Sequence, residues 1–237
     1  MANIVLIEGK SGSGKSTAIR NLNPDTTYLF RIINKPLPFQ GAMGKFVEGK
    51  NQKTIYTTSF LNSNNIKQGY ADASKGLCTS LNNVATKLPH VNAIVIDDSQ
   101  YLMSYELMSR AREKSFDKFV EIQQNFFNVI QTAQMLPDNL TVFFLHHTDE
   151  SDPNNIKAKT VGKMIDNSIT LEGVFTIVLL ANARKENGKI SHFFITQSDG
   201  TTTAKSPMGM FDDEIENDLQ LVLTKMNEYY KQELKVA

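Results

Sequence analysis

The sequence predicts an α/β fold, in which a mainly parallel central sheet is flanked by helices and extended by a C-terminal antiparallel hairpin. Short apolar runs with β-branched residues alternate with helical patterns along much of the chain, which is typical of a parallel sheet buried on both faces. Asn187-Gly188 lies between two further strand-like runs and is a strong hairpin signal. The sequence has no internal repeat and no clear linker, so we expect a single domain over residues 1–237.

The expected elements follow one another in the order that a parallel sheet requires. We expect strands at residues 3–8, 26–33, 91–100, 140–147, 173–184 and 189–197, and a weaker one at 54–58. We expect helices at residues 16–22, 72–88, 100–136 and 213–234. Pro89 and Pro137 end two of these helices, because proline lacks the backbone N–H group that a helix interior needs. Apolar residues at helical spacing from Phe116 to Ile130 predict a helix face packed in the core.

The composition is that of a globular protein, with 25 basic and 25 acidic residues and no net charge. Any nucleic-acid binding must therefore come from a local basic patch. Cys78 is the single cysteine, so no disulfide can form within the chain, which fits a reducing compartment. We see no signal peptide and no apolar run long enough to span a bilayer, so we expect a cytoplasmic protein without membrane contact.

The segment GKSGSGKST at residues 9–17 carries the clearest chemical signal. It matches the pattern G-x-x-x-x-G-K-[ST], with a strand expected before it and a helix after it. Glycines in such a loop let the backbone wrap closely around phosphate groups. We expect Lys15 to reach the β- and γ-phosphates of a nucleoside triphosphate, and the Ser16 hydroxyl to ligate Mg²⁺. The expected nucleotide-binding residues are Gly9, Ser11, Gly12, Ser13, Gly14, Lys15, Ser16 and Thr17.

Two aspartates follow the apolar run AIVI in the strand expected at residues 91–100. Asp97 is the candidate that completes the Mg²⁺ shell, because paired acids at the end of a buried strand are costly without a cation. The alternative is that Asp97 caps the next helix. Asp98 could orient or activate a water molecule, or it could cap the same helix.

Two histidines end the strand expected at residues 140–147. A polar residue at that position could face the γ-phosphate and respond to its loss on hydrolysis. His147 is the first candidate and His146 the second, and the alternative is a surface histidine at a strand end. A zinc site needs more nearby ligands than these two histidines, so we do not expect one.

Several lysines are candidates for contacts with other molecules. Lys157, Lys159 and Lys163 lie in or next to the polar loop after the histidines and could contact a phosphodiester backbone. A solvated loop explains them equally well. Lys205 follows the last hairpin strand and could reach the nucleotide of a neighbouring subunit, or it could be a surface lysine beside a turn.

Taken together, these segments resemble the RecA-like core of the P-loop ATPases. The resemblance rests on the glycine-rich loop, on AIVIDDSQYL and LTVFFLHH, and on the hairpin that follows. More closely, the chain looks like the small bacteriophage ATP-binding proteins of the AAA type, through KPLPF, KTVGKMID and TTAKSPMGMF at residues 35–39, 159–166 and 202–211. This resemblance covers most of the chain.

The resemblance implies a P-loop NTPase fold and Mg²⁺-dependent ATP hydrolysis. It further implies that hydrolysis is coupled to phage DNA recombination, repair or replication, through binding or annealing of single-stranded DNA. The protein would act as a homo-oligomer in the host cytoplasm, where residues 148–163 touch DNA and Lys205 acts on the nucleotide of a neighbouring subunit.

The sequence departs from the RecA-like pattern at the catalytic base. RecA-like recombinases carry a glutamate after the second core strand, where this chain has Asn34 and Lys35. The remaining candidates for the water-activating base are Asp98 and Glu8. The chain also lacks the separate DNA-binding domains of larger recombinases.

Two other functions fit the glycine-rich loop. A small-molecule or nucleotide kinase shares such a loop, but it usually needs several arginines to clamp phosphates, and the five arginines of this chain form no obvious cluster. A nucleotide-gated binding protein with negligible turnover fits the missing glutamate. We favour the ATPase over both.

Overall fold

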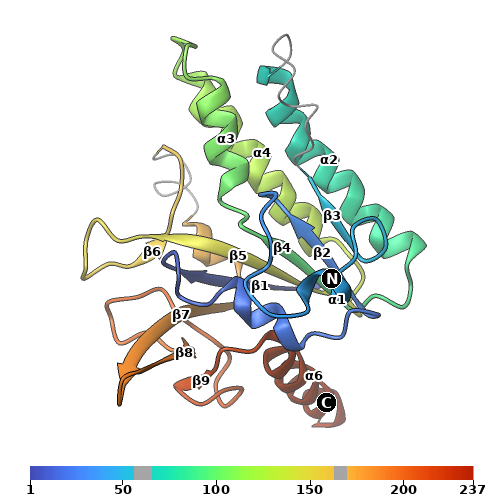
Figure 1. The fold of residues 1–237 in the computed structure, drawn as a ribbon, viewed down its shortest axis with the longest axis vertical. Coiled ribbons are helices and arrows are strands. Elements are labelled where there is room, and N and C mark those ends of the chain that lie inside the picture. The colour runs from blue at the N-terminus through green and yellow to red at the C-terminus, as the bar shows by residue number, and fades with distance from the viewer. Residues whose placement is uncertain (56–65, 163–169, 237) are drawn as a thin grey trace.

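The computed structural model describes residues 1–55, 66–162 and 170–236 (Figure 1). A mostly parallel sheet lies at its centre, helices flank the sheet, and an antiparallel hairpin extends it. The strands are β1 (Asn3–Gly9), β2 (Thr27–Arg31), β3 (Gln52–Thr54), β4 (Ala93–Asp97), β5 (Thr141–Asp149), β6 (Lys157–Ala158), β7 (Ile177–Glu186), β8 (Lys189–Ile195) and β9 (Glu214–Glu216). The helices are α1 (Ala42–Lys45), α2 (Ile66–Lys87), α3 (Tyr101–Ser109), α4 (Asp117–Gln134) and α6 (Leu219–Val236), with the 3-10 helices η1 (Ser16–Asn21) and η3 (Leu171–Val174).

Strand β1 lies inside the sheet, between β5 and β7. Among the described strands the order is β3-β2-β4-β5-β1-β7-β8-β9, and β6 pairs with β5. The strands from β3 to β7 in this order run parallel, and all five residues of β4 are buried, as expected for a strand covered on both faces. The carboxyl ends of β1, β2, β4 and β5 therefore meet at one edge, where Gly9 lies opposite His147 and Arg31 opposite Asp97.

Helices cover the two faces of the sheet with separate apolar clusters. On one face, α2, α3 and α4 pack against Leu6, Ile96 and Phe144 (Figure 1). On the other face, η1 and α6 pack against Ile7 and Leu145. Because side chains alternate along a strand, neighbouring residues of β1 and β5 point to different faces and meet different helices. Within the described ranges, no helix is both long and apolar enough to cross a membrane.

The predicted hairpin is confirmed, and a further strand extends it. Asn187 and Gly188 have φ angles of 50° and 78°, which a type I′ turn requires of its two central residues. Strand β9 then pairs with β8, so that Ile215 lies opposite Phe194. The prediction of a helix from residue 213 onward is wrong at its start, because the buried position of Ile215 draws this segment into the sheet.

The long helical region predicted at residues 100–136 is divided into α3 and α4. Near the break, the buried guanidinium of Arg110 pairs with Glu106 and Glu113, and this network holds the turn between the helices. Phe126 and Ile130 are buried as predicted. Phe116 precedes α4 and is 83% exposed, so the expectation that it packs in the core is wrong.

Other elements also differ from the sequence-based expectation, and the strand expected at residues 173–184 is β7, which begins at Ile177 and ends at Glu186. The segment after β1 forms the short 3-10 helix η1 and not an α-helix. Helix α2 begins at Ile66, six positions before the expected residue 72. The strand expected at residues 54–58 ends at Thr54 as β3, and residues 56–58 lie outside the described residues.

Candidate functional site

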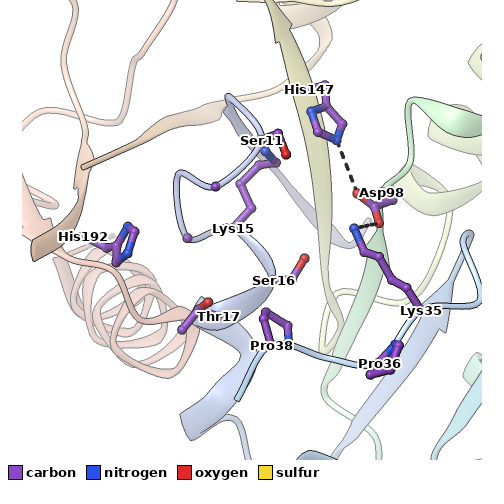
Figure 2. Close-up of a pocket in the computed structure, with 12 residues that line it drawn as sticks. Ser11, Lys15, Ser16, Thr17, Lys35, Pro36, Pro38, Asp98, His147 and His192 are labelled. Carbon is purple, nitrogen blue, oxygen red and sulfur yellow. Dashed lines mark ion pairs between the residues drawn. The ribbon is translucent and has the colours of Figure 1, made fainter. Parts of the chain in front are cut away.

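A cleft opens at the carboxyl edge of the sheet (Figure 2). Its volume is about 290 Å³, and it lies where ligands bind in open parallel sheets. The glycine-rich loop, the loop after β2, the ends of β4 and β5, and strand β8 contribute its walls. The lining residues are Ser11, Gly12, Gly14, Lys15, Ser16, Thr17, Lys35, Pro36, Pro38, Asp98, His147 and His192.

The glycine-rich loop, residues 9–16, needs glycine where the sequence places it. Gly12 and Gly14 have φ angles of 81° and 94°, in the left-handed region that favours glycine. A Cβ atom on Gly9 would lie 2.6 Å from the carbonyl oxygen of Ala181, so the backbone of β7 could not approach the loop so closely. Of the expected nucleotide-binding residues, Gly9 and Ser13 do not line the cleft, and Ser13 is buried behind the loop.

The ammonium group of Lys15 folds back onto its own loop. Its Nζ atom donates to the carbonyl oxygens of Gly9 at 2.6 Å and Lys10 at 2.7 Å. Burial lowers the pKa of Lys15 to about 8, although the charges of Asp98 and Asp97 oppose this shift. Lys15 is therefore a buried cation held by neutral carbonyl groups, and an anion in the cleft would be a better partner.

Ser16, the first residue of η1, meets Asp97, the last residue of β4. The Ser16 hydroxyl donates to Oδ1 of Asp97 at 2.8 Å. Burial, and then the charge of Asp98, raise the pKa of Asp97 to about 6. A hydroxyl and a buried carboxylate are oxygen donors that Mg²⁺ prefers, so the residues fit this cation. The described residues contain no group of three or more His, Cys, Asp or Glu side chains that could hold a metal ion.

Asp98 is held by two side chains in the cleft (Figure 2). Its Oδ2 atom lies 2.5 Å from the Nζ atom of Lys35, and its Oδ1 atom lies 3.4 Å from Nε2 of His147. Burial would raise the pKa of Asp98, but hydrogen bonds from His147 and Lys35 hold it below its ordinary value. Asp98 has a φ angle of 60°, and helix α3 begins after Gln100 without a side-chain cap, so the geometry does not favour the helix-cap alternative.

The two histidines of β5 have different environments. His147 lines the cleft and faces Asp98. His146 is fully buried, with Nδ1 2.9 Å from Oγ of Ser99 and Nε2 2.8 Å from the carbonyl oxygen of Lys159. Burial lowers the pKa of His146 to about 3, so its ring is neutral at pH 7. The sequence placed both histidines at a strand end, but only His147 faces the cleft.

Glu8, the second candidate base, lies away from the cleft. Its side chain is fully buried, Oε1 accepts a hydrogen bond from the Thr203 hydroxyl at 2.7 Å, and Oε2 has no hydrogen-bond partner. Burial raises its pKa to about 8. A carboxyl group that is protonated at pH 7 and absent from the cleft wall is poorly placed to activate water there.

Two of the loop lysines attach closely to β5. Lys157 lies in β6, opposite Asp149, and the backbone N–H of Lys159 donates to the carbonyl oxygen of His147 at 2.8 Å. Lys163 lies outside the described residues. The pKa of Asp149 is lowered first by hydrogen bonds from Ser151 and then by the charges of Lys157 and Lys159. The lysines thus lie beside an acidic residue, and their positive field is partly compensated.

Lys205 lies against β7 and not in the cleft. It exchanges two backbone hydrogen bonds of 2.8 Å with Val178, and it does not line the cleft of its own chain.

Two residues of the cleft were not recognised in the sequence as parts of a site. Lys35 was noted only as a departure from a family pattern, yet it pairs with Asp98. His192 belongs to β8, and its Nδ1 atom lies 3.2 Å from the carbonyl oxygen of Ser13. Lys35 lies four positions after the end of β2, so its place in the loop after a buried strand was a usable signal, whereas nothing local marks His192.

Comparison with known protein families and a search of curated proteins found no match.

Proposed function

We propose that the protein is a Mg²⁺-dependent ATPase with a RecA-like P-loop core. The contact between Ser16 and Asp97 carries this proposal, because it joins the glycine-rich loop to a strand-end carboxylate 81 positions away. The sequence pattern predicts these two residues for one Mg²⁺ site, and they meet next to Lys15 at the wall of the cleft, which Ser16 lines and behind which Asp97 is buried.

The loop residues that line the cleft bind the phosphates. The backbone at Gly12 and Gly14 follows the phosphate chain, and Lys15 exchanges its carbonyl partners for the β- and γ-phosphates. Ser16 and Asp97 would hold Mg²⁺, which supplies positive charge to the phosphate oxygens when it is bound. Thr17 and His192 line the part of the cleft next to the loop.

Hydrolysis needs a residue that prepares water. The water oxygen bonds to the γ-phosphorus, the bond from this phosphorus to the β,γ-bridging oxygen breaks, and the products are ADP and inorganic phosphate. Asp98 is the carboxylate of the cleft that can orient the water and accept its proton, and His147 orients Asp98 and faces the γ-phosphate.

We further propose that this activity is coupled to single-stranded DNA in a phage-type recombination, repair or replication reaction. The resemblance to bacteriophage ATP-binding proteins suggests this coupling, and one contact supports it. The hydrogen bond between the Lys159 N–H and the His147 carbonyl ties the lysine-bearing loop to a wall of the cleft. A movement of His147 would therefore also move the loop that carries Lys157 and Lys159. These two lysines would contact the phosphodiester backbone.

The first experiment measures ATP binding and phosphate release with Mg²⁺, with and without single-stranded DNA. Phosphate release that increases with DNA supports the full proposal. Tight binding without release would favour a nucleotide-gated binding protein, and transfer to a nucleoside monophosphate would indicate a kinase. No arginine lines the cleft, so the structure offers no observation in favour of the kinase.

A second experiment tests the role of Lys205 across subunits. We expect Lys205→Ala to lower ATPase activity in the oligomer without weakening ATP binding by an isolated subunit. Mixing this variant with Lys15→Ala subunits should restore part of the activity, because each defect then lies in a different subunit. Absence of restored activity in mixed oligomers would exclude the proposed action across subunits.

A further inference from the structure

Lys35 enters the cleft from the side opposite the glycine-rich loop. Figure 2 shows its side chain reaching toward Asp98, while Lys15 lies on the other side of the cleft. Its Nζ atom is 2.5 Å from Oδ2 of Asp98, and its side chain keeps 46% of its surface exposed. Lys35 is thus paired, but it is not enclosed, and an anion in the cleft can reach it.

The backbone of Lys35 is fixed, so the position of its side chain is defined by the fold. Its carbonyl oxygen accepts a hydrogen bond from Arg31 at 3.0 Å, and its N–H donates to Ile33 at 2.9 Å. Pro36 and Pro38 follow and also line the cleft, and proline restricts the backbone of this wall. Movement of the ammonium group therefore requires only side-chain rotation.

The charges of the cleft balance before any ligand enters. Lys15 and Lys35 are the cations, and Asp97 and Asp98 are the anions that act on them. In the proposed function, the loop and Lys15 surround the β-phosphate. Only a third phosphate extends beyond the loop toward Asp98, so only a triphosphate brings new negative charge to the wall that carries Lys35.

We propose that Lys35 is a phosphate-contacting residue that distinguishes nucleoside triphosphate from diphosphate. Its ammonium group rotates from Asp98 to the terminal phosphate, which offers several anionic oxygens where Asp98 offers one carboxylate. With a diphosphate, no phosphate reaches this wall and Lys35 stays on Asp98. This inference rests on the proposed function, and it adds the residue that distinguishes a chain of three phosphates from a chain of two.

The test compares the binding of a non-hydrolysable ATP analogue and of ADP, each with Mg²⁺, by calorimetry. We expect Lys35→Met to weaken analogue binding about tenfold or more and to leave ADP binding within about twofold, because a charge-assisted hydrogen bond is lost only with the third phosphate. Lys50→Met is the control, since Lys50 is an exposed lysine outside the cleft and should change neither affinity.

Two further variants separate the proposal from simpler effects. Lys35→Arg keeps the cation and should retain the preference for the triphosphate. Lys35→Met leaves the buried Asp98 with His147 as its partner and without its lysine, so the double variant Lys35→Gln with Asp98→Asn removes both charges while allowing a hydrogen bond between the two side chains. It avoids a buried carboxylate that has lost its cation and should also lose the preference, which keeps the test valid if Lys35→Met is unstable.

The outcomes distinguish this inference from the proposed function. Suppose that wild-type protein binds the analogue, and that the Lys35 variants keep the wild-type ratio of analogue affinity to ADP affinity. This result would overturn the role of Lys35 and would leave the proposed function standing. Equal weakening of analogue and ADP would also overturn it, because the effect would then be general electrostatics. Wild-type protein that binds neither nucleotide would overturn the proposed function and this inference together.

Discussion

Two polar clusters lie on opposite faces of the same strand ends, and they differ in kind. The cleft cluster consists of Lys15, Ser16, Asp97, Asp98, Lys35 and His147, and its members line or adjoin an open cleft. The buried cluster consists of Glu8, Ser99, His146 and Thr203, and none of these residues lines that cleft. Gly9 follows Glu8 and His147 follows His146, so a shift of one residue along a strand separates the two clusters.

The comparison shows how burial, together with the presence or absence of charged partners, divides similar residues into two roles. In the buried cluster, burial raises the pKa of Glu8 to about 8 and lowers that of His146 to about 3, so both side chains are neutral at pH 7. In the cleft, Asp98 stays ionised because Lys35 and His147 donate to it. Charged groups with exchangeable partners can bind and react, whereas neutral groups with fixed partners stabilise the edge of the sheet.

The largest expected effect tests the cleft through Lys15. Lys15→Ala removes a cation that is expected to make hydrogen bonds to two phosphates, so ATP affinity should fall about a hundredfold or more. Fluorescence or calorimetric titration with Mg²⁺ and ATP measures this change. Lys10→Ala is the control, because Lys10 lies in the same loop with a side chain that is 71% exposed, paired with Glu150. Equal affinity in wild type and Lys15→Ala would refute the phosphate-binding assignment.

The second prediction separates the two histidines. His146→Ala removes a buried ring and two hydrogen bonds, so the free energy of unfolding should fall by about 2–4 kcal/mol. His147→Ala should change stability by less than about 1 kcal/mol and should instead lower ATP turnover. Chemical denaturation and phosphate release measure the two effects. If His147→Ala lost as much stability as His146→Ala, the division between cleft and buried cluster would not hold.

The third prediction concerns the pH dependence of stability through Glu8. Its pKa is raised from 4.5 to about 8 in the folded protein, so the native state keeps a proton that the unfolded state releases. The stabilising contribution is complete below pH 4.5 and is lost as pH rises toward 8. Glu8→Gln does not ionise, so its stability relative to wild type should rise by on the order of 2 kcal/mol between pH 5 and 8. A constant difference over this range would show that Glu8 is already ionised at pH 5.

The smallest effect comes from two glycines of the loop. Both Gly12→Ala and Gly14→Ala place a side chain at a positive φ angle, which costs about 1 kcal/mol or more. A Cβ atom on Gly14 would also lie 2.9 Å from Nδ1 of His192, whereas nothing lies within 4 Å of one on Gly12. Gly14→Ala should therefore be less stable than Gly12→Ala by about 1 kcal/mol. Adding His192→Ala to Gly14→Ala should reduce this difference, because it removes the ring atoms and leaves only the Cβ atom of residue 192 at 3.2 Å, and thermal denaturation measures both.

The sequence was sufficient for features that depend on local pattern. Apolar runs indicated the parallel strands, and Asn187-Gly188 indicated the hairpin, because strand burial and turn conformation follow from a few neighbouring residues. The glycine-rich loop was likewise located by its own residues. The roles assigned to Lys15, Ser16 and Asp97 remain predictions, but the structure places these residues together.

The sequence was insufficient where the result depends on contacts between distant segments. His146 and His147 point to opposite faces because side chains alternate along a strand, but which of the two is enclosed depends on Ser99 and Lys159, which contact His146 from other segments. The pairing of Lys35 with Asp98 depends on β2 lying next to β4, which no local pattern states. The contact of His192 with the loop joins residues 179 positions apart.

The short helix η1 has a consequence for truncated or cleaved forms of the protein. Its six residues follow the glycine-rich loop, and its apolar residues pack under α6. Arg20 donates to the carbonyl oxygen of Asn217, and Asn21 donates to Asp218, each 197 positions further along the chain. A polypeptide cut before β9 would keep every residue of the loop and yet lose the surface on which η1 rests. Proteolysis or a stop codon far downstream would therefore disable the loop as surely as a substitution within it.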